Sequence, residues 1–236
     1  MAFSPNKHAR LVFQTNYIYN DSRMEGVDAS SEESAEIVAD LRLNAQNSQY
    51  CVEDKEAYLS IAGSYSMYQD IFSYPVEEEC SVFDMVALHR KLFSYYPNPE
   101  YGGMFRQSDT LVMGAKFETV SYRQIYAELL IVDEALQELI SQRDNLSLSA
   151  FIEEIFKIHH RLTVIHPFGD GNGRTLRAFM NALLVRNQIS PLYIKMEEKE
   201  EYVVGLSKAD TQNSYDQLYE CLFKCLLRSS VDLNDV

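Results

Sequence analysis

The sequence predicts an all-α protein with one small β-hairpin, and three observations support this fold class. Only nine glycines and six prolines interrupt the 236 residues. Apolar residues recur at spacings of three and four, the period of a helix with one buried face. One short stretch breaks this period and alternates instead. The hydrophobic content of 46% is enough for a core, and the length is that of one domain.

The helical segments follow one another along the chain. The first helix is predicted at residues 7–20, and a second begins near Ser30, where Ser30 and Glu33 have the spacing of a capping box. Further helices are predicted near residues 54–73, 82–94, 121–144, 149–165, 174–188 and 214–228. We expect residues 1–50 to form an N-terminal helical segment packed on a core domain of residues 51–236.

The stretch without helical periodicity is Gly102–Tyr122, "GGMFRQSDTLVMGAKFETVSY". It opens with two glycines, and Leu111, Met113 and Ala115 alternate with other residues around Gly114. Alternation near glycine is typical of a short β-hairpin between two helices. A solvated connecting loop is the alternative.

Charge and composition exclude several partners and locations. A formal net charge of −14 and a pI near 4.8 argue against nucleic acid and anionic membranes, which attract clustered Lys and Arg. The sequence shows no signal peptide and no apolar run of membrane-spanning length. Its four cysteines form no C-x-x-C pair, and Cys221 and Cys225, one helical turn apart, are expected to be buried free thiols. These features favour a cytoplasmic protein.

The segment His166–Arg177, "HPFGDGNGRTLR", has the composition of an anion-binding site. Gly171, Asn172 and Gly173 lead directly into a predicted helix, so unobstructed backbone N–H groups and the helix dipole favour an anion there. Arg174 and Arg177 lie three apart and project from one side of the first turn. Each positive charge at a helix N-terminus costs about 0.3–1 kcal/mol unless an anion lies nearby. The segment therefore predicts a polyphosphate site.

Two further residues of the segment indicate a reaction at that site. Asp170 would repel phosphate directly, but it suits Mg²⁺, which one or two carboxylates and phosphate oxygens commonly hold. His166 could then take a proton from an incoming hydroxyl. Taken singly, each of these residues is more often structural. Their combination is specific.

The segment matches the signature HxFx(D/E)GNGRxxR in full, and the chain therefore resembles the Fic family. The resemblance implies the Fic fold, a helical bundle with a β-hairpin flap before the motif. It also implies transfer of AMP from Mg-ATP to a Ser, Thr or Tyr hydroxyl of a target protein, with pyrophosphate leaving. In this chain His166 would be the general base and Asp170 the Mg²⁺ ligand. The phosphates would contact Gly171, Asn172, Gly173, Arg174 and Arg177. The related Doc-type kinases lack the GNGR stretch that this chain keeps.

The resemblance also implies roles for the hairpin and for a tyrosine. The flap would hold the target by strand addition through Leu111, Val112, Met113, Gly114 and Phe117. Tyr202 stands where family members often have an aromatic residue beside the adenine, whereas Asp210 stands near a family Asn. The alternative for Tyr202 is a packing residue.

The N-terminal stretch "YIYNDSRMEGVDAS" resembles the inhibitory motif (S/T)xxxE(G/N) of Fic proteins. Glu25 and Gly26 occupy the Glu-Gly places, and Asp21 departs from the family by standing in the Ser/Thr place. The resemblance implies that Glu25 pairs with Arg177 and competes with the γ-phosphate for the same guanidinium. Alternatively, Glu25 only ends a helix before Gly26.

The resemblance therefore implies a protein adenylyltransferase that uses ATP and Mg²⁺ and is inhibited by its own N-terminal segment. Its partner would be a protein with an accessible hydroxyl, which can include the enzyme itself, and a homodimer is compatible with the sequence. Two alternatives stay open. One is a Fic enzyme that uses another donor or removes AMP. The other is a non-catalytic module that responds to ATP, although the intact His166 argues against it.

Overall fold

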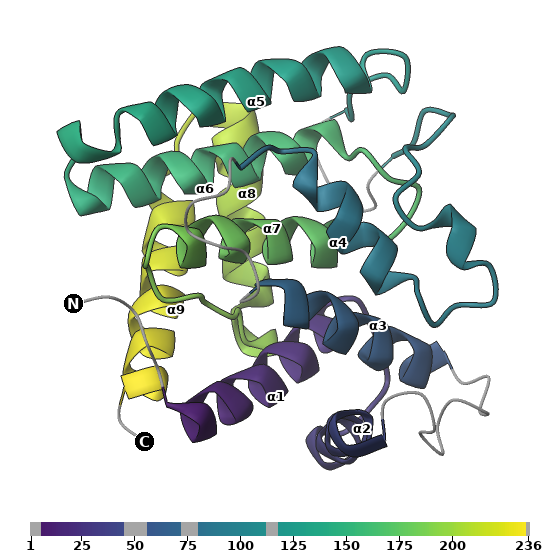
Figure 1. Cartoon of the computed structure of the whole chain (residues 1–236). Helices are drawn as coiled ribbons and strands as arrows, with labels where there is room; N and C mark the ends of the chain where they lie inside the picture. Colours follow the sequence, from purple (N-terminus) through teal and green to yellow (C-terminus); the bar gives the residue numbers. More distant parts are fainter. Residues whose placement is uncertain (1–5, 45–55, 72–79, 112–117, 235–236) are drawn as a thin grey trace.

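The computed structural model describes residues 6–44, 56–71, 80–111 and 118–234, which are almost entirely helical (Figure 1). No helix among these residues is long and apolar enough to span a bilayer. The α-helices are α1 (Lys7–Met24), α2 (Ser31–Asn44), α3 (Glu56–Ile71), α4 (Asp84–Leu92), α5 (Ile125–Ser141), α6 (Leu148–Ile165), α7 (Asn172–Arg186), α8 (Lys199–Gln212) and α9 (Asp216–Asn234). Short 3-10 turns cover Pro99–Tyr101, Arg143–Asn145 and Met196–Glu198.

Helix α7 is the centre of the bundle (Figure 1). All of its residues are buried except Gly173 and Val185, which are half-buried. Helices α3, α4 and α6 pack around it, and α5 lies against the outer side of α6. Its apolar residues predict one buried face, but Arg174, Thr175 and Asn181 are buried as well. Helices on several sides of α7 also enclose its polar residues, which sequence periodicity cannot indicate.

Helix α1 belongs to the same core as the rest of the chain. Phe13, Tyr17 and Ile18 are at most 1% exposed. The Phe13 ring lies 5.5 Å from that of Tyr193 and the Tyr17 ring 5.4 Å from that of Tyr68, measured between centroids. The predicted division at residue 50 falls at 45–55, outside the described residues, and stays a prediction.

Most predicted helices are present with shifted ends. The capping box before α2 is confirmed, since Ser30 N–H donates to Glu33 Oε2 at 2.8 Å and Glu33 N–H donates to Ser30 Oγ at 3.1 Å. Helix α1 continues to Met24, four residues past its predicted end. Helix α8 was not predicted. Its buried residues are Tyr202, Gly205 and Ala209, whose small or amphipathic side chains give little apolar periodicity.

The predicted hairpin lies largely outside the described residues, because 112–117 are not among them. Within the described part, the β pairing found is one isolated antiparallel bridge between Phe105 and Phe168. Thr119 Oγ1 donates to the Thr110 carbonyl at 2.5 Å, which brings the two ends of the segment together. The described cysteines Cys80, Cys221 and Cys225 are free and buried, as expected for the last two.

We predict that Gly63→Ala destabilises the fold by about 1–3 kcal/mol, the usual cost of overpacking a core. A Cβ at Gly63 on α3 would lie 2.9 Å from the Leu92 carbonyl carbon, with the carbonyl oxygen closer still. Urea unfolding followed by circular dichroism measures the change, with Ser66→Ala on the same helix as the control. A Gly63→Ala protein as stable as this control would contradict the close contact of α3 with the end of α4.

Candidate functional site

The segment 166–177 connects α6 to α7 through a sharp turn. His166 caps α6 in the left-handed conformation, with φ 50° and ψ 61°, and its N–H donates to the Leu162 carbonyl at 3.0 Å. This conformation is uncommon for residues other than glycine. It ends the helix at His166 and directs Pro167 and Phe168 across to the start of α7.

The loop is closed by the side chain of Asn172. Phe168 N–H donates to Asn172 Oδ1 at 2.9 Å, and Asn172 Nδ2 donates to the Phe168 carbonyl at 2.8 Å. Asn172 is 3% exposed and Phe168 is fully buried, so this pair fixes the loop from the inside. The phosphate contact predicted for Asn172 would therefore come from its backbone N–H.

Helix α7 begins without a side-chain cap, because its N-cap residue is Gly171. Gly171 has φ 71°, and a Cβ there would lie 2.8 Å from the Phe93 ring and 2.9 Å from a Leu92 methyl group. Only glycine meets both restrictions. The first amides of an α-helix have no intrahelical acceptor, and here no N-cap side chain supplies one. The helix start can thus attract an anion.

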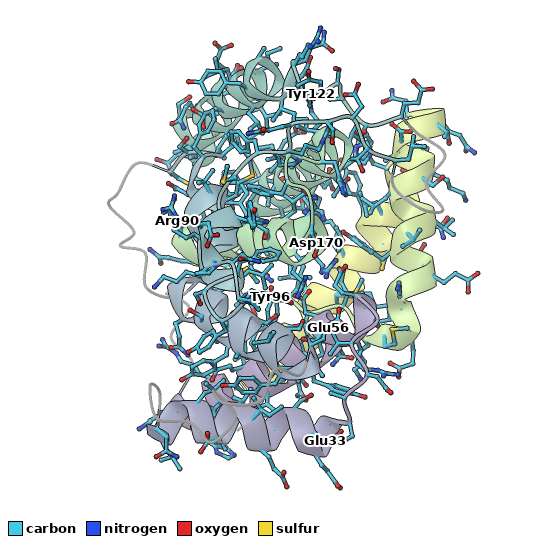
Figure 2. The ribbon with its side chains drawn as sticks, turned by 90° about the vertical axis from the view of Figure 1, so that its right-hand side faces the viewer. Glu33, Glu56, Arg90, Tyr96, Tyr122 and Asp170 are labelled. Carbon is cyan, nitrogen blue, oxygen red and sulfur yellow. The ribbon has the colours of Figure 1, made fainter. Side chains whose placement is uncertain are left out.

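Asp170 lies on the molecular face seen in Figure 2, at a level between Tyr122 and Tyr96. Its side chain is exposed, and Oδ1 accepts a hydrogen bond from Gly171 N–H at 2.6 Å. The described residues contain no group of three or more His, Cys, Asp or Glu side chains placed to hold a metal. A divalent cation at Asp170 would need further oxygens from a bound phosphate or water, a donor set that suits Mg²⁺.

The two arginines of the motif point to different elements. Arg174 is 5% exposed, and its Nη1 donates to Ser60 Oγ on α3 at 2.7 Å. Its Nε is buried and has no partner among the described residues. Arg177 is 6% exposed and turns toward α1. Both guanidinium groups are therefore held close to the start of α7.

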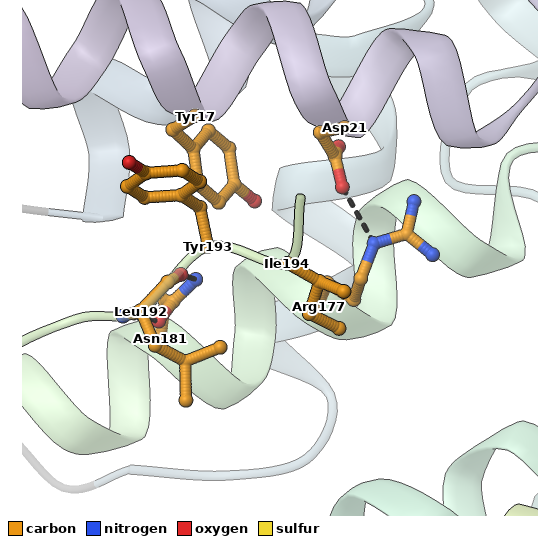
Figure 3. A pocket seen from close by; sticks show the side chains of 7 residues that line it. All are labelled: Tyr17, Asp21, Arg177, Asn181, Leu192, Tyr193 and Ile194. Atoms are coloured by element: carbon orange, nitrogen blue, oxygen red, sulfur yellow. Dashed lines mark hydrogen bonds and ion pairs between the residues drawn. The ribbon is translucent and has the colours of Figure 1, made fainter. Parts of the chain in front are cut away.

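Two carboxylates of α1 and its C-cap hold Arg177. Arg177 Nε donates to Asp21 Oδ1 at 2.5 Å, and Nη2 donates to Glu25 Oε1 at 2.7 Å. Figure 3 shows the Asp21 carboxylate pointing from α1 toward the guanidinium. A Cβ on Gly173 would overlap Glu25 Oε1, so this carboxylate lies directly against the first turn of α7. The structure brings Glu25 and Arg177 together, as the resemblance implied.

The Asp21 contact was not predicted, although its position contains a signal. Asp21 and Glu25 are four residues apart, a spacing that places two side chains on one side of a helix. Asp21 is 4% exposed, whereas the Glu25 side chain is 32% exposed. Burial raises the pKa of Asp21. Burial also acts to raise the pKa of Glu25, but the charge and hydrogen bond of Arg177 outweigh it and lower that pKa.

A small cavity lies beside the Asp21–Arg177 pair, and both of these residues line it (Figure 3). Its volume is about 10 Å³, enough for one water molecule. Asp21 Oδ2 and the Tyr17 hydroxyl are buried without a partner among the described residues. Both residues line the cavity, so one water there could satisfy them.

His166 is half-buried, and an arginine that sequence reasoning missed holds its backbone. Arg106 Nε donates to the His166 carbonyl at 2.8 Å, and Arg106 N–H donates to the Pro167 carbonyl at 2.9 Å. Arg106 is 7% exposed. Because arginine is almost never fully buried, the stretch "GGMFRQ" gave no sign of this role. Burial lowers the pKa of His166, and the Arg106 charge acts in the same direction.

His89 on α4 is a second residue near the site that the sequence did not predict. It is 3% exposed, and burial lowers its pKa to about 4. Its Nε2 lies 2.9 Å from the Asp170 carbonyl, which attaches α4 to the loop before α7. Its position on α4 has helical spacing with the buried apolar residues Met85 and Leu92, a pattern that is typical of a core residue.

The remaining predicted residues are Tyr202 and those of the flap. Tyr202 is 4% exposed, and its hydroxyl lies 2.7 Å from His159 Nε2, so it packs in the core. Tyr202 also lies close to Arg177. Burial raises the pKa of its hydroxyl more than the charge of Arg177 lowers it. Its predicted contact with adenine stays a prediction. In the flap, Leu111 is 81% exposed. Val112, Met113, Gly114 and Phe117 lie outside the described residues.

Residues 79–184 match the Fic/DOC family. The chain contains a Fic/DOC family domain. This chain is 27% identical over 133 residues to "Protein adenylyltransferase fic-1" of Caenorhabditis elegans. A segment is 30% identical over 132 residues to "Protein adenylyltransferase Fic" of Drosophila virilis. Both matches cover 56% of this chain but only 25% and 26% of the two relatives.

Solved structures show the same fold over most of this chain. A Fic domain containing signaling protein from Bacteroides thetaiotaomicron has a TM-score of 0.75 at 20% identity, covering 95% of this chain and 87% of the other. BepC from Bartonella tribocorum, solved with bound AMPPNP, has a TM-score of 0.58 at 17% identity and covers 73% and 88%. At these identities the likeness establishes the Fic fold.

The burial of His166 predicts that its imidazole titrates below 6.5, the usual value for histidine. Burial disfavours the charged form, so the ring is neutral and able to accept a proton at neutral pH. NMR titration of the free protein, with the signal assigned from the His166→Ala spectrum, measures the midpoint. A midpoint at or above 6.5 would show that the surrounding carboxylates outweigh burial.

Proposed function

We propose that this protein transfers AMP from ATP to a hydroxyl side chain of a protein. The observation that carries the proposal is the placement of His166 beside the uncapped start of α7. The charges of Glu25 and Asp170 both act on the His166 imidazole. Glu25 in turn lies against Gly173 and Arg177. The proposed proton acceptor and the proposed anion-binding helix start therefore adjoin one another, and two similar proteins carry the name adenylyltransferase.

The proposed step is an in-line displacement at the α-phosphate of ATP. The hydroxyl oxygen of the target forms the new bond to phosphorus, and the bond to the β-phosphate oxygen breaks. Pyrophosphate leaves with that electron pair, and His166 takes the hydroxyl proton. The backbone amides of Gly171, Asn172 and Gly173 would hold the triphosphate. Most of the rate enhancement in such a site comes from positioning and charge stabilisation.

The residues at the site suit a magnesium nucleotide. The exposed Asp170 would hold Mg²⁺, which neutralises phosphate charge and fixes the phosphate geometry. Arg174 and Arg177 would contact the β- and γ-phosphates, and the unpaired Nε of Arg174 leaves a donor for this purpose. The acceptor of AMP would be a Ser, Thr or Tyr of another protein or of this chain.

We further propose that the contact seen between α1 and Arg177 is inhibitory. Glu25 lies where the helix dipole and Arg177 would otherwise attract a phosphate, so the carboxylate competes with the γ-phosphate. Asp21 adds a second carboxylate on the same guanidinium, in the place where the family motif has Ser or Thr. Two anions on one arginine would resist displacement more strongly than one.

Labelled nucleotide tests the proposed reaction. We expect label from α-³²P-ATP to enter protein in the Glu25→Gly background, and none from γ-³²P-ATP. Adding His166→Ala should abolish this transfer while Mg-ATP affinity stays nearly unchanged, because the imidazole contacts the hydroxyl. Label from the γ-position alone would identify a kinase and refute the proposal. A protein already carrying AMP, supplied as substrate, would reveal AMP removal instead.

Substitutions at Glu25, Asp21 and Arg177 test the proposed inhibition. We expect Glu25→Gly to raise labelling by roughly one to two orders of magnitude, since a charge-assisted pair is worth about 1.5–3 kcal/mol. Asp21→Ser in that background should raise it further. Arg177→Ala should cancel the gain, because the same guanidinium binds the phosphate.

The control for this experiment is Asp84→Asn. It removes the carboxylate of another Arg–Asp pair, in which Asp84 of α4 lies 2.9 Å from Arg186. Arg186 is at the opposite end of α7 from the proposed site. No gain in labelling is expected from it. Equal labelling by wild type and Glu25→Gly, at matched folded fraction and ATP concentration, would show that α1 is only a structural part of the core.

A further inference from the structure

We infer that His89 is a positioning residue that connects the Asp170 loop to the segment holding His166. The inference rests on the proposed function, because it concerns how the proposed nucleotide site is kept in shape. His89 lies on α4, outside the segment 166–177, and it does not touch the proposed nucleotide or hydroxyl. Its effect would therefore pass through the backbone of other residues.

Both ring nitrogens of His89 are bonded to backbone groups. Gly103 N–H donates to Nδ1 at 2.7 Å, so Nδ1 must be an acceptor. The proton of the neutral ring is consequently on Nε2, which donates to the Asp170 carbonyl at 2.9 Å. Each nitrogen has one partner, and the two partners are 67 residues apart in the sequence. A single imidazole thus joins two distant backbone segments.

Packing fixes the plane of the His89 ring. It stacks on the Phe168 ring with centroids 3.8 Å apart and an angle of 10° between the planes. The ring of Phe93, the C-cap residue of α4, lies 4.7 Å away. Because the ring cannot rotate without losing these contacts, the two hydrogen bonds keep their directions. The loop residue Phe168 is held by the same ring that holds Asp170.

The two backbone segments hold opposite ends of one loop. Gly103 is followed three residues later by Arg106, which bonds the His166 and Pro167 carbonyls. Asp170 is at the other end of the loop, immediately before the α7 N-cap. With the His89 bond removed, the Asp170 carbonyl loses a partner and the Asp170–Gly171 peptide can rotate. That rotation would displace both the proposed Mg²⁺ ligand and the start of the phosphate site.

Two isosteric substitutions separate the two bonds. Asn places its side-chain oxygen near the position of Nδ1, so His89→Asn keeps an acceptor for Gly103 and loses the donor to Asp170. Gln places its amide nitrogen near Nε2, so His89→Gln keeps the donor to Asp170 and loses the acceptor for Gly103. The matched control is His160→Gln, at a buried histidine of α6 whose Nδ1 faces the Tyr215 hydroxyl at 3.0 Å.

Hydrogen–deuterium exchange of the nucleotide-free protein gives the first readout. We expect His89→Asn to speed exchange at residues 168–173 and to leave Gly103 protected. His89→Gln should show the reverse pattern. The His160→Gln control should change neither segment. The second readout is the dissociation constant of Mg-AMPPNP in the Glu25→Gly background, which should rise by about tenfold in His89→Asn and stay within about threefold in His89→Gln.

The outcomes separate this inference from the proposed function. Equal exchange at 168–173 in His89→Asn, His89→Gln and the control would overturn the positioning role. If His89→Asn does not fold, the exchange pattern of His89→Gln decides. In that variant, exchange that speeds up more at residues 168–173 than at Gly103 would contradict the assignment of Nε2 as the donor to Asp170. If Glu25→Gly with an intact His89 fails to bind Mg-AMPPNP, the nucleotide proposal fails, while the exchange data still decide the role of His89.

Discussion

The structure depends on negatively charged groups that lie close to the start of α7. This helix begins at a glycine without a side-chain cap and carries two buried arginines in its first turns. Leaving one buried ionic partner alone typically costs about 3–5 kcal/mol. In the present conformation Asp21 and Glu25 supply the charge. The anion requirement is thus a property of the fold itself, and the proposed inhibitor and the proposed substrate satisfy the same requirement in turn.

The surroundings of α7 determine which parts of the site can move. Helices α3, α4 and α6 enclose α7, and position 171 admits only glycine because Leu92 and Phe93 leave no room for a Cβ. Arg174 is also tied to Ser60 on α3. The side proposed to bind phosphate is therefore held rigidly by its neighbours. Glu25 is different, since it lies at the C-cap of α1 and its side chain is partly exposed. Exchange of one anion for another must take place on the α1 side.

The sequence predicted the parts of this site that are contiguous. His166–Arg177 is one segment whose residue types have direct chemical meaning, and Glu25 lies in a recognisable motif. Arg106, His89 and Asp21 were missed for one physical reason. Each acts through contacts with residues distant in the sequence, and burial of a charged or polar side chain leaves no periodic pattern. Helix α8 was missed because its packing surface uses Gly205, against which the α9 backbone at Leu218 packs closely.

The burial of α1 limits how the proposed inhibition could be relieved. Phe13, Tyr17 and Ile18 are core residues, so the helix cannot leave as a unit without opening the hydrophobic core. Its C-cap is different, because Glu25 and Gly26 are exposed and Gly26 has φ 85°. Rearrangement at the end of a helix is a local event that costs far less free energy than global unfolding. The proposed release would thus be a local movement of Glu25 within an intact protein, while Asp21, Ser22 and Met24 stay buried in the last turn of α1.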